Sequence, residues 1–202
     1  STRLLKNIIG LWLVQECRRS WAKQGNEYSY EQLTEMAIKS KPYQSVFNPL
    51  DPSFIAPDNM PKLISEICNE TNQVVPKTPG EIIRCALESL ALLYAKTLSE
   101  AEKLVGWKAE KLHIVGGGSK NVLLNQLTAD AANIDVVAGP AEATASGNVL
   151  VQAIADGVVR DLDEARQIIN RSFDTETFNP KASLELENMT NRFNQICTDS
   201  SL

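Results

Sequence analysis

Apolar residues recur at helical spacing along much of the chain. The stretch from Leu4 to Trp21 is apolar almost all round, with polar breaks that include Asn7 and Gln15, which predicts a helix packed on most sides. A longer helix is predicted after Thr78-Pro79-Gly80-Glu81, because the threonine, the proline and the glutamate together form a capped helix start. Its apolar positions continue at helical period to Val105. These patterns indicate a helix-rich chain.

A proline-rich segment between Lys41 and Pro61 interrupts the helical patterns. Its five prolines exclude a continuous helix or a central strand, so we predict an extended loop. Four apolar side chains are expected to hold this loop against the core: Phe47, Leu50, Phe54 and Ile55.

Two short apolar strands, each followed by a turn and a helix, come after the longest predicted helix. The strands are predicted at 112–115 and 134–138, and the helices at 121–132 and 143–155. This alternation is typical of a parallel α/β unit. Because parallel strands end at the same edge of a sheet, both turns are expected at the edge where ligands of open α/β sheets bind. Further helices are predicted at about 161–170 and 184–196.

The first of these turns is Gly116-Gly117-Gly118-Ser119, which lacks a Cβ atom at three successive positions. A ligand can therefore approach the main chain closely, near the unpaired N–H groups that begin the next helix. The turn fits neither a Walker loop nor a dinucleotide fingerprint, which needs a glycine where Asn121 stands. On the residues alone, a nucleotide site and a plain tight turn remain equally favoured. At the second turn, a simple strand-to-helix connection is favoured for Glu142.

Two amide side chains, Asn7 and Gln15, would lie about 12 Å apart along one helix and within a right angle around it. One helix could thus present an amide to each of two ligands, and amides satisfied by nearby backbone are the alternative. The single histidine, His113, is expected in the core, and no Ser-His-Asp or Cys-His set is available.

Composition and charge narrow the classes of function. The 202 residues suit one domain of ordinary size, and the net charge of −5 argues against a nucleic-acid partner. No apolar run approaches the roughly 18 residues of a membrane span, and no secretory signal pattern is present, so we expect a cytoplasmic protein. The four cysteines lack metal-ligand spacing and are predicted to be buried thiols: Cys17, Cys68, Cys85 and Cys197.

A long stretch of the sequence resembles one enzyme family. The segment HIVGGGSKNVLLNQLTADAANIDVVAGPAEATASGN is similar to the nucleotide-binding stretch of rhamnulokinases, which belong to the FGGY family of carbohydrate kinases. Its signatures are HIVGGG, N-x-L-L-N-Q and V-x-A-G-P-x-E-A-[ST]. Three further stretches agree: LLKNIIGLWLVQE, RCALESLALLY and FNPLDPSFIAPDNM. The resemblance covers residues 1–180 and fades beyond them.

The resemblance implies the C-terminal, nucleotide-binding lobe of a kinase with two ribonuclease H-like lobes, as in the actin-like ATPase fold. Residues 1–180 would form this lobe without its first strands, and residues 181–202 a peripheral helix and tail. We therefore expect an incomplete, helix-rich α/β domain whose short sheet contains parallel strands and has an open edge. Such an edge would allow a homodimer.

The resemblance also implies a reaction, in which the γ-phosphoryl group of ATP is transferred to the 1-hydroxyl of L-rhamnulose with the help of Mg²⁺. At matching positions, Gly117 would contact ATP within the turn Gly116 to Ser119 that Gly118 helps to shape, Gln15 would contact the nucleotide, and Asn7 the sugar. Cys68 and Cys85 match a pair that can be disulfide-linked in the family, although a reducing cytoplasm disfavours that bond.

The family's catalytic aspartate and first phosphate loop lie upstream of the matched segment, and neither motif occurs in this sequence. No catalytic residue or metal ligand is therefore assigned to this chain. Mg²⁺ is expected to be held mainly outside it, and the chain to be inactive without the N-terminal lobe. The alternatives are another FGGY kinase, such as a fuculokinase or xylulokinase, and a stand-alone nucleotide-binding module.

Overall fold

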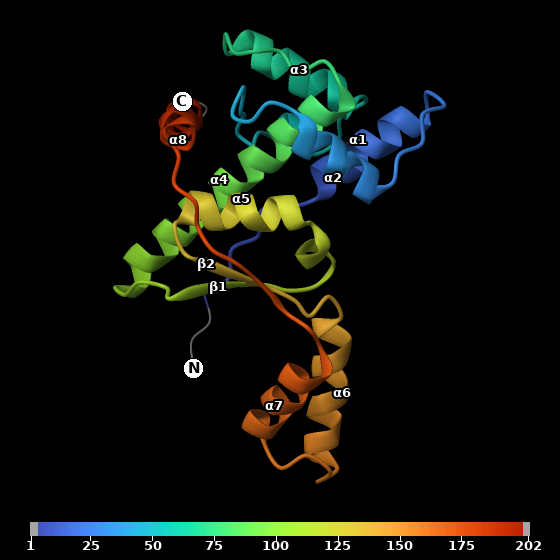
Figure 1. The fold of residues 1–202 in the computed structure, drawn as a ribbon, viewed down its shortest axis with the longest axis vertical. Helices are drawn as coiled ribbons and strands as arrows, with labels where there is room; N and C mark the ends of the chain where they lie inside the picture. The colour runs from blue at the N-terminus through green and yellow to red at the C-terminus, as the bar shows by residue number, and fades with distance from the viewer. Residues whose placement is uncertain (1–3, 200–202) are drawn as a thin grey trace.

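The computed structural model describes residues 4–199, which form a helix-rich α/β fold around one long helix (Figure 1). This architecture confirms the predicted class. The described helices are α1 (Trp12–Ala22), α2 (Tyr30–Lys39), α3 (Met60–Glu70), α4 (Pro79–Val105), α5 (Val122–Ala132), α6 (Ala143–Ala155), α7 (Leu162–Ser172) and α8 (Leu184–Asp199). The strands are β1 (Lys111–Ile114), β2 (Asp135–Ala138) and β3 (Glu176–Phe178), and two 3₁₀ turns are η1 (Pro52–Phe54) and η2 (Gly117–Lys120).

Helix α4 is the central element of the fold. It starts with the predicted capping box, in which Thr78 Oγ1 accepts from the Glu81 N–H at 3.3 Å and Glu81 Oε2 accepts from the Thr78 N–H at 2.9 Å. Its first half is buried in the largest hydrophobic core, and it packs against α1, α2, α3, α5 and α8. The predicted helix is therefore confirmed, and its neighbours are positioned relative to it.

Helix α2 lies so close to the start of α4 that only glycine fits between them. A Cβ atom at Gly80 would lie 2.6 Å from the backbone oxygen of Met36 and 2.7 Å from Ser40 Oγ. The missing side chain thus sets the distance between α2 and α4.

The sheet has the strand order β1-β2-β3. Strands β1 and β2 are parallel, with Leu112 opposite Val136, which confirms the predicted pair. Strand β3, which was not predicted, pairs antiparallel to β2 and makes the sheet mixed. Because β1 is the edge strand and only alternate residues are covered, His113 is exposed. The expectation of a core histidine is wrong.

The helix predicted from Leu4 to Trp21 forms only in its second half, as α1. The segment 4–10 has no helical structure and runs beside α4, where Lys6 Nζ lies 2.8 Å from Glu100 Oε2. Ile8 and Ile9 pack against buried side chains from this extended path. Tertiary packing, not helical period, thus explains their apolar character.

The proline-rich segment is a loop with the short turn η1, as predicted. Phe47 and Phe54 are fully buried with ring centroids 4.7 Å apart, whereas Leu50 and Ile55 are exposed and do not anchor the loop. The loop ends earlier than expected, because Asn59 caps α3 by accepting from the Lys62 N–H. Helices α2 and α3 were not predicted.

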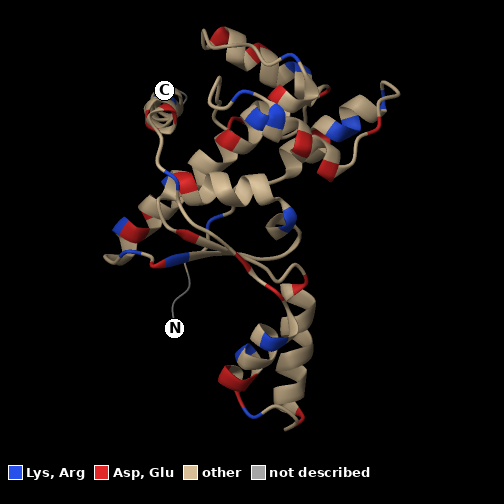
Figure 2. Ribbon diagram, in the orientation of Figure 1, with Lys and Arg blue, Asp and Glu red and all other residues tan. Residues whose placement is uncertain are grey.

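Helices α6, α7 and α8 confirm the predicted helices of the C-terminal part. Helix α6 pairs with α7, and the two extend away from the sheet (Figure 1). No residue of α6 is buried. The helix also has no charged side chain, as the colours of Figure 2 show. Helix α8 packs on α4 through a second hydrophobic cluster that includes Leu186 and Phe193.

Candidate functional site

The turns that follow β1 and β2 lie side by side at one edge of the sheet. The Gly116 N–H donates to the Pro140 carbonyl at 3.1 Å, and the Gly139 N–H donates to the Ile114 carbonyl at 2.8 Å. Gly116 has φ +78° and Gly139 φ +111°, conformations that favour glycine. The two glycine turns therefore meet as the parallel strand pair predicted.

The turn from Gly116 to Ser119 is fixed by side-chain hydrogen bonds, while the Cα atoms of its three glycines are uncovered. The Ser119 hydroxyl donates to the Gly116 carbonyl at 2.7 Å, and the buried amide of Asn125 donates to the Ser119 carbonyl at 2.8 Å. Apart from atoms of the same glycine and its neighbours along the chain, no heavy atom lies within 4 Å of the position that a Cβ would take at Gly116, Gly117 or Gly118. A ligand can therefore reach this backbone directly. Asn125 was not singled out from the sequence, although it lies in the N-x-L-L-N-Q signature.

Helix α2 contacts the end of the glycine turn. Asn121 caps α5 by accepting from the Leu124 N–H at 2.9 Å, and its amide donates to Thr34 Oγ1 at 3.4 Å. The Thr34 hydroxyl in turn donates to the Tyr30 carbonyl at 2.9 Å. The turn and the first residues of α2 thus belong to one connected surface.

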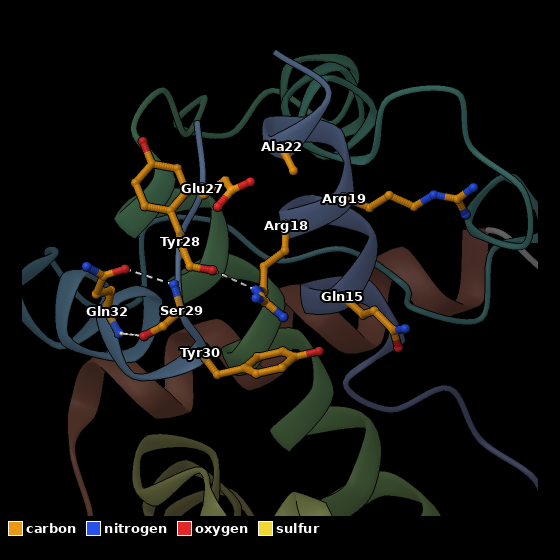
Figure 3. Close-up of a pocket in the computed structure, with 9 residues that line it drawn as sticks. All are labelled: Gln15, Arg18, Arg19, Ala22, Glu27, Tyr28, Ser29, Tyr30 and Gln32. Carbon is orange, nitrogen blue, oxygen red and sulfur yellow. Dashed lines mark hydrogen bonds between the residues drawn. The ribbon is translucent and has the colours of Figure 1, made fainter. Parts of the chain in front are cut away.

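A cavity of about 720 Å³ lies between α1 and residues 27–32, and Gln15 is one of the residues that line it (Figure 3). Arg18 crosses this cavity, with Nε donating to the Tyr28 carbonyl at 2.8 Å and the guanidinium carbon 4.1 Å from the centroid of the Tyr30 ring. The structure therefore brings Gln15 into a pocket with an aromatic wall. Neither Arg18 nor Tyr30 was predicted from the sequence.

Charges of both signs lie between the cavity and the glycine turn. The pKa of Glu31 is lowered chiefly by a hydrogen bond from its own backbone N–H and by one from Ser29. The charges of Arg18, beside the cavity, and Lys120, at the end of the turn, lower it further. Glu31 therefore stays ionised at neutral pH, between these two cations.

Asn7 does not share a helix with Gln15, so the predicted geometry of two amides on one helix is wrong. Asn7 is exposed on the extended segment beside α4, because α1 begins only at Trp12. Its sugar-binding role therefore rests on the resemblance alone.

Residues 1–155 match the family described as FGGY family of carbohydrate kinases, C-terminal domain. The chain belongs to this family. The rhamnulokinase of Bacillus subtilis (strain 168) is 45% identical over 179 residues, which cover 89% of this chain and 36% of the relative. The rhamnulokinase of Enterococcus faecalis (strain ATCC 700802 / V583) is 45% identical over 204 residues, which cover 99% of this chain and 40% of the relative. The FGGY chain thus spans about two fifths of the length of these curated relatives.

Solved sugar kinases share the fold of this FGGY chain. The xylulose kinase from Rhodospirillum rubrum superposes with a TM-score of 0.62 at 17% identity, over 93% of this chain and 37% of that structure. A ligand-bound xylulose kinase from Lactobacillus acidophilus gives a TM-score of 0.60 at 16% identity, over 95% of this chain and 37% of that structure. At such low identity, the likeness shows the fold alone.

All four cysteines of the FGGY chain are buried, as the sequence predicted, and Cys17, Cys68 and Cys85 are free thiols. The Sγ atoms of Cys68 and Cys85 are 3.8 Å apart, and the Ser45 hydroxyl is 3.5 Å from Cys85 Sγ. The pKa of Cys85 is raised by its hydrogen bond with Cys68 and by burial. The two cysteines implied as a disulfide pair are therefore adjacent but unbonded in this structure.

Residues 4–199 contain neither a candidate metal centre nor a candidate membrane span. No three His, Cys, Asp or Glu side chains within this range are grouped so that they could hold a metal ion. Across the same residues, no helix combines the length and apolar character that crossing a membrane requires.

Proposed function

We propose that this chain is the C-terminal, nucleotide-binding lobe of a rhamnulokinase, an ATP-dependent kinase that phosphorylates L-rhamnulose at its 1-hydroxyl. The lobe would be of the ribonuclease H-like type without its first strands, with residues 1–180 forming its body and α8 a peripheral helix. The observation that carries the proposal is the open glycine turn at the carboxyl ends of two parallel strands, in a chain 45% identical to rhamnulokinases.

The residues of the turn fit a phosphorylated nucleotide. Three glycines leave the backbone uncovered, and the buried Asn125 fixes the turn from the side opposite the ligand. Backbone N–H groups can bind phosphate oxygens without a net positive charge. The turn would therefore hold ATP in position, and Gln15 would contact it from α1.

Positioning one substrate does not complete phosphoryl transfer, which also needs the acceptor hydroxyl aligned and the developing charge stabilised. ATP supplies the phosphoryl group, and this chain binds and orients it. We propose that the part of the longer kinase that precedes this segment supplies the catalytic aspartate and most of the magnesium ligands. The chain alone would then be inactive.

Two apolar surfaces of the chain support a docked N-terminal part. Helix α6 leaves Val149 66% and Val151 59% exposed, and β1 has an open edge at which Val115 is 53% exposed. Parallel strands are normally covered on both faces, and an uncovered edge invites pairing. Because the chain spans 36–40% of its relatives, we propose that the preceding part of the longer kinase covers these surfaces.

A coupled ADP-release assay tests this function. The purified 202-residue chain should show no sugar-dependent ADP formation, and activity should appear after mixing with the separately produced N-terminal part. L-rhamnulose should be preferred to L-fuculose and D-xylulose, the substrates of the alternative kinases. Val149→Asp, on the exposed face of α6, should prevent activation by mixing while ADP binding by the chain persists.

Three outcomes would contradict the proposal. Robust activity of the chain alone would refute the need for a second lobe. Nucleotide binding without activation by the N-terminal part would favour a stand-alone module. A stable homodimer in sedimentation velocity, lost in Val149→Asp, would mean that a second copy covers α6.

A further inference from the structure

Tyr30 presents an exposed aromatic ring in a fixed orientation at the start of α2. The guanidinium of Arg18 lies over the ring at 4.1 Å from its centroid, and the Tyr28 carbonyl holds Arg18 through a 2.8 Å hydrogen bond. Tyr30 nevertheless remains 42% exposed. Figure 3 shows its phenol ring extending beneath Arg18 toward the side where Gln15 lies. The ring is therefore held in place with surface left for a ligand.

This ring lies on the same surface as the glycine turn. Thr34 links the two, because its hydroxyl donates to the Tyr30 carbonyl and accepts from the Asn121 amide at 3.4 Å. Asn121 directly follows the turn that we propose binds ATP. A nucleotide seated on the turn can therefore extend toward Tyr30.

Charges of both signs surround Tyr30, since Arg18, Arg19 and Glu27 all line the cavity. Glu31, which follows Tyr30 in the sequence, has a lowered pKa. Arg18 is already held by the Tyr28 carbonyl and the Tyr30 ring, whereas the bare N–H groups of the glycine turn are open to phosphate groups. A base, in contrast, can stack on an aromatic side chain.

We propose that Tyr30, held by Arg18, is a base-stacking residue, and that the cavity between α1 and residues 27–32 takes the base and ribose of ATP or ADP. This inference rests on the proposed nucleotide site and assigns the nucleoside end of the ligand to a second group of residues. Gln15 lines the same cavity, within reach of the polar edge of the nucleoside.

Titration of the 202-residue chain with ADP, adenosine and pyrophosphate tests the inference. Tyr30→Ala should weaken the binding of ADP and adenosine by the same factor, about 5- to 150-fold, because both lose one stacking contact. It should leave pyrophosphate binding unchanged. Tyr30→Phe retains the ring and should retain the affinity for all three. Gly117→Val should weaken ADP and pyrophosphate but not adenosine.

The matched control is Trp107→Ala, which removes another exposed aromatic ring on the turn after α4 and should change none of these affinities. Thermal unfolding of each variant checks that the fold is retained, since Tyr30 is 42% and Trp107 64% exposed. If Tyr30→Ala binds adenosine as tightly as the wild type, or weakens only the phosphate-bearing ligands, the stacking role is refuted while the nucleotide site stands. If the wild type binds no ADP, either alone or after mixing with the N-terminal part, the proposed function fails and the stacking role fails with it.

Discussion

Gly80→Ala should destabilise the chain, although alanine is normally the better helix residue. The new Cβ would lie 2.6 Å from the Met36 carbonyl oxygen and 2.9 Å from its carbonyl carbon, where ordinary contacts begin at 3.4 Å. The Ser40 side chain, 2.7 Å away, can rotate, but the backbone of α2 cannot. Helices α2 and α4 must therefore separate by nearly 1 Å.

The magnitude follows from two opposing effects. Overpacking of a close contact typically costs about 1–3 kcal/mol, and replacing glycine by alanine within a helix returns about 0.5–1 kcal/mol. The net loss should be about 1–2 kcal/mol of unfolding free energy, which lowers the melting temperature by about 2–8 °C for a chain of this size. Thermal and urea denaturation followed by circular dichroism at about 222 nm measure it, since that signal reports the helices.

Gly147→Ala provides the matched control, because Gly147 lies within α6 and a Cβ there would meet no atom within 4 Å. The same substitution should leave the melting temperature unchanged or raise it. Equal melting temperatures for Gly80→Ala and Gly147→Ala would refute the close approach of α2 to α4. Since Tyr30 is the first residue of α2, Gly80→Ala should also weaken ADP binding.

Two further predictions concern the helix cap and the ligand contacts. Glu81→Ala should cost less than about 1 kcal/mol at neutral pH, because Glu81 completes the cap of α4. Hydrogen bonds from the Lys77 and Thr78 N–H groups lower the pKa of Glu81, so this stability is present above the ordinary glutamate pKa of about 4.3 and is lost as the pH falls through the lowered value. If the stability difference between the wild type and Glu81→Ala in urea denaturation were as large at about pH 2 as at neutral pH, this prediction would be contradicted. In the longer kinase, Gln15→Ala should raise the KM for ATP, and Asn7→Ala should raise the KM for the sugar, each by about 2- to 12-fold. If steady-state kinetics showed that both changes affect the same substrate, the assignment would be contradicted.

The elements that the sequence predicted well carry their own local signals. Helix α4 has a complete capping box, α5 begins at the cap Asn121, and α6 matches its predicted bounds of 143–155. The starts of α4 and α5 depend on side chains within one turn of the helix, so no distant contact is needed to recognise them, whereas α6 has no side-chain cap.

Most failures fall where distant contacts decide the structure, with two exceptions. The segment 4–10 is extended because Ile8 and Ile9 pack into clusters built from other elements, which overrides their helical spacing. Strand β3 has three residues and exists through its pairing with β2. Helices α2 and α3 are the exceptions, because the capping box of Ser29 and Gln32 and the cap Asn59 are local signals that the sequence displays.

The candidate site shows the same division between local and distant information. The glycine turn was predicted because three missing Cβ atoms are visible in the sequence. The Arg18–Tyr30 pair could not be predicted, since it depends on how α1 meets the start of α2. The prediction that Asn7 and Gln15 face two ligands was wrong because it assumed that both residues lie on a single helix.

Both halves of the proposed nucleotide site are supported by α4. Helix α2, which carries Tyr30, packs on it through Gly80, and α5, which carries Asn125 beneath the glycine turn, packs on it as well. The core that joins α1, α2, α4 and α5 is formed within this chain, whereas the exposed surfaces of α6 and β1 lie outside that core. Nucleotide binding should therefore survive in the isolated chain even though phosphoryl transfer does not. A chain that folded but bound ADP only after the N-terminal part was added would show that this support is insufficient.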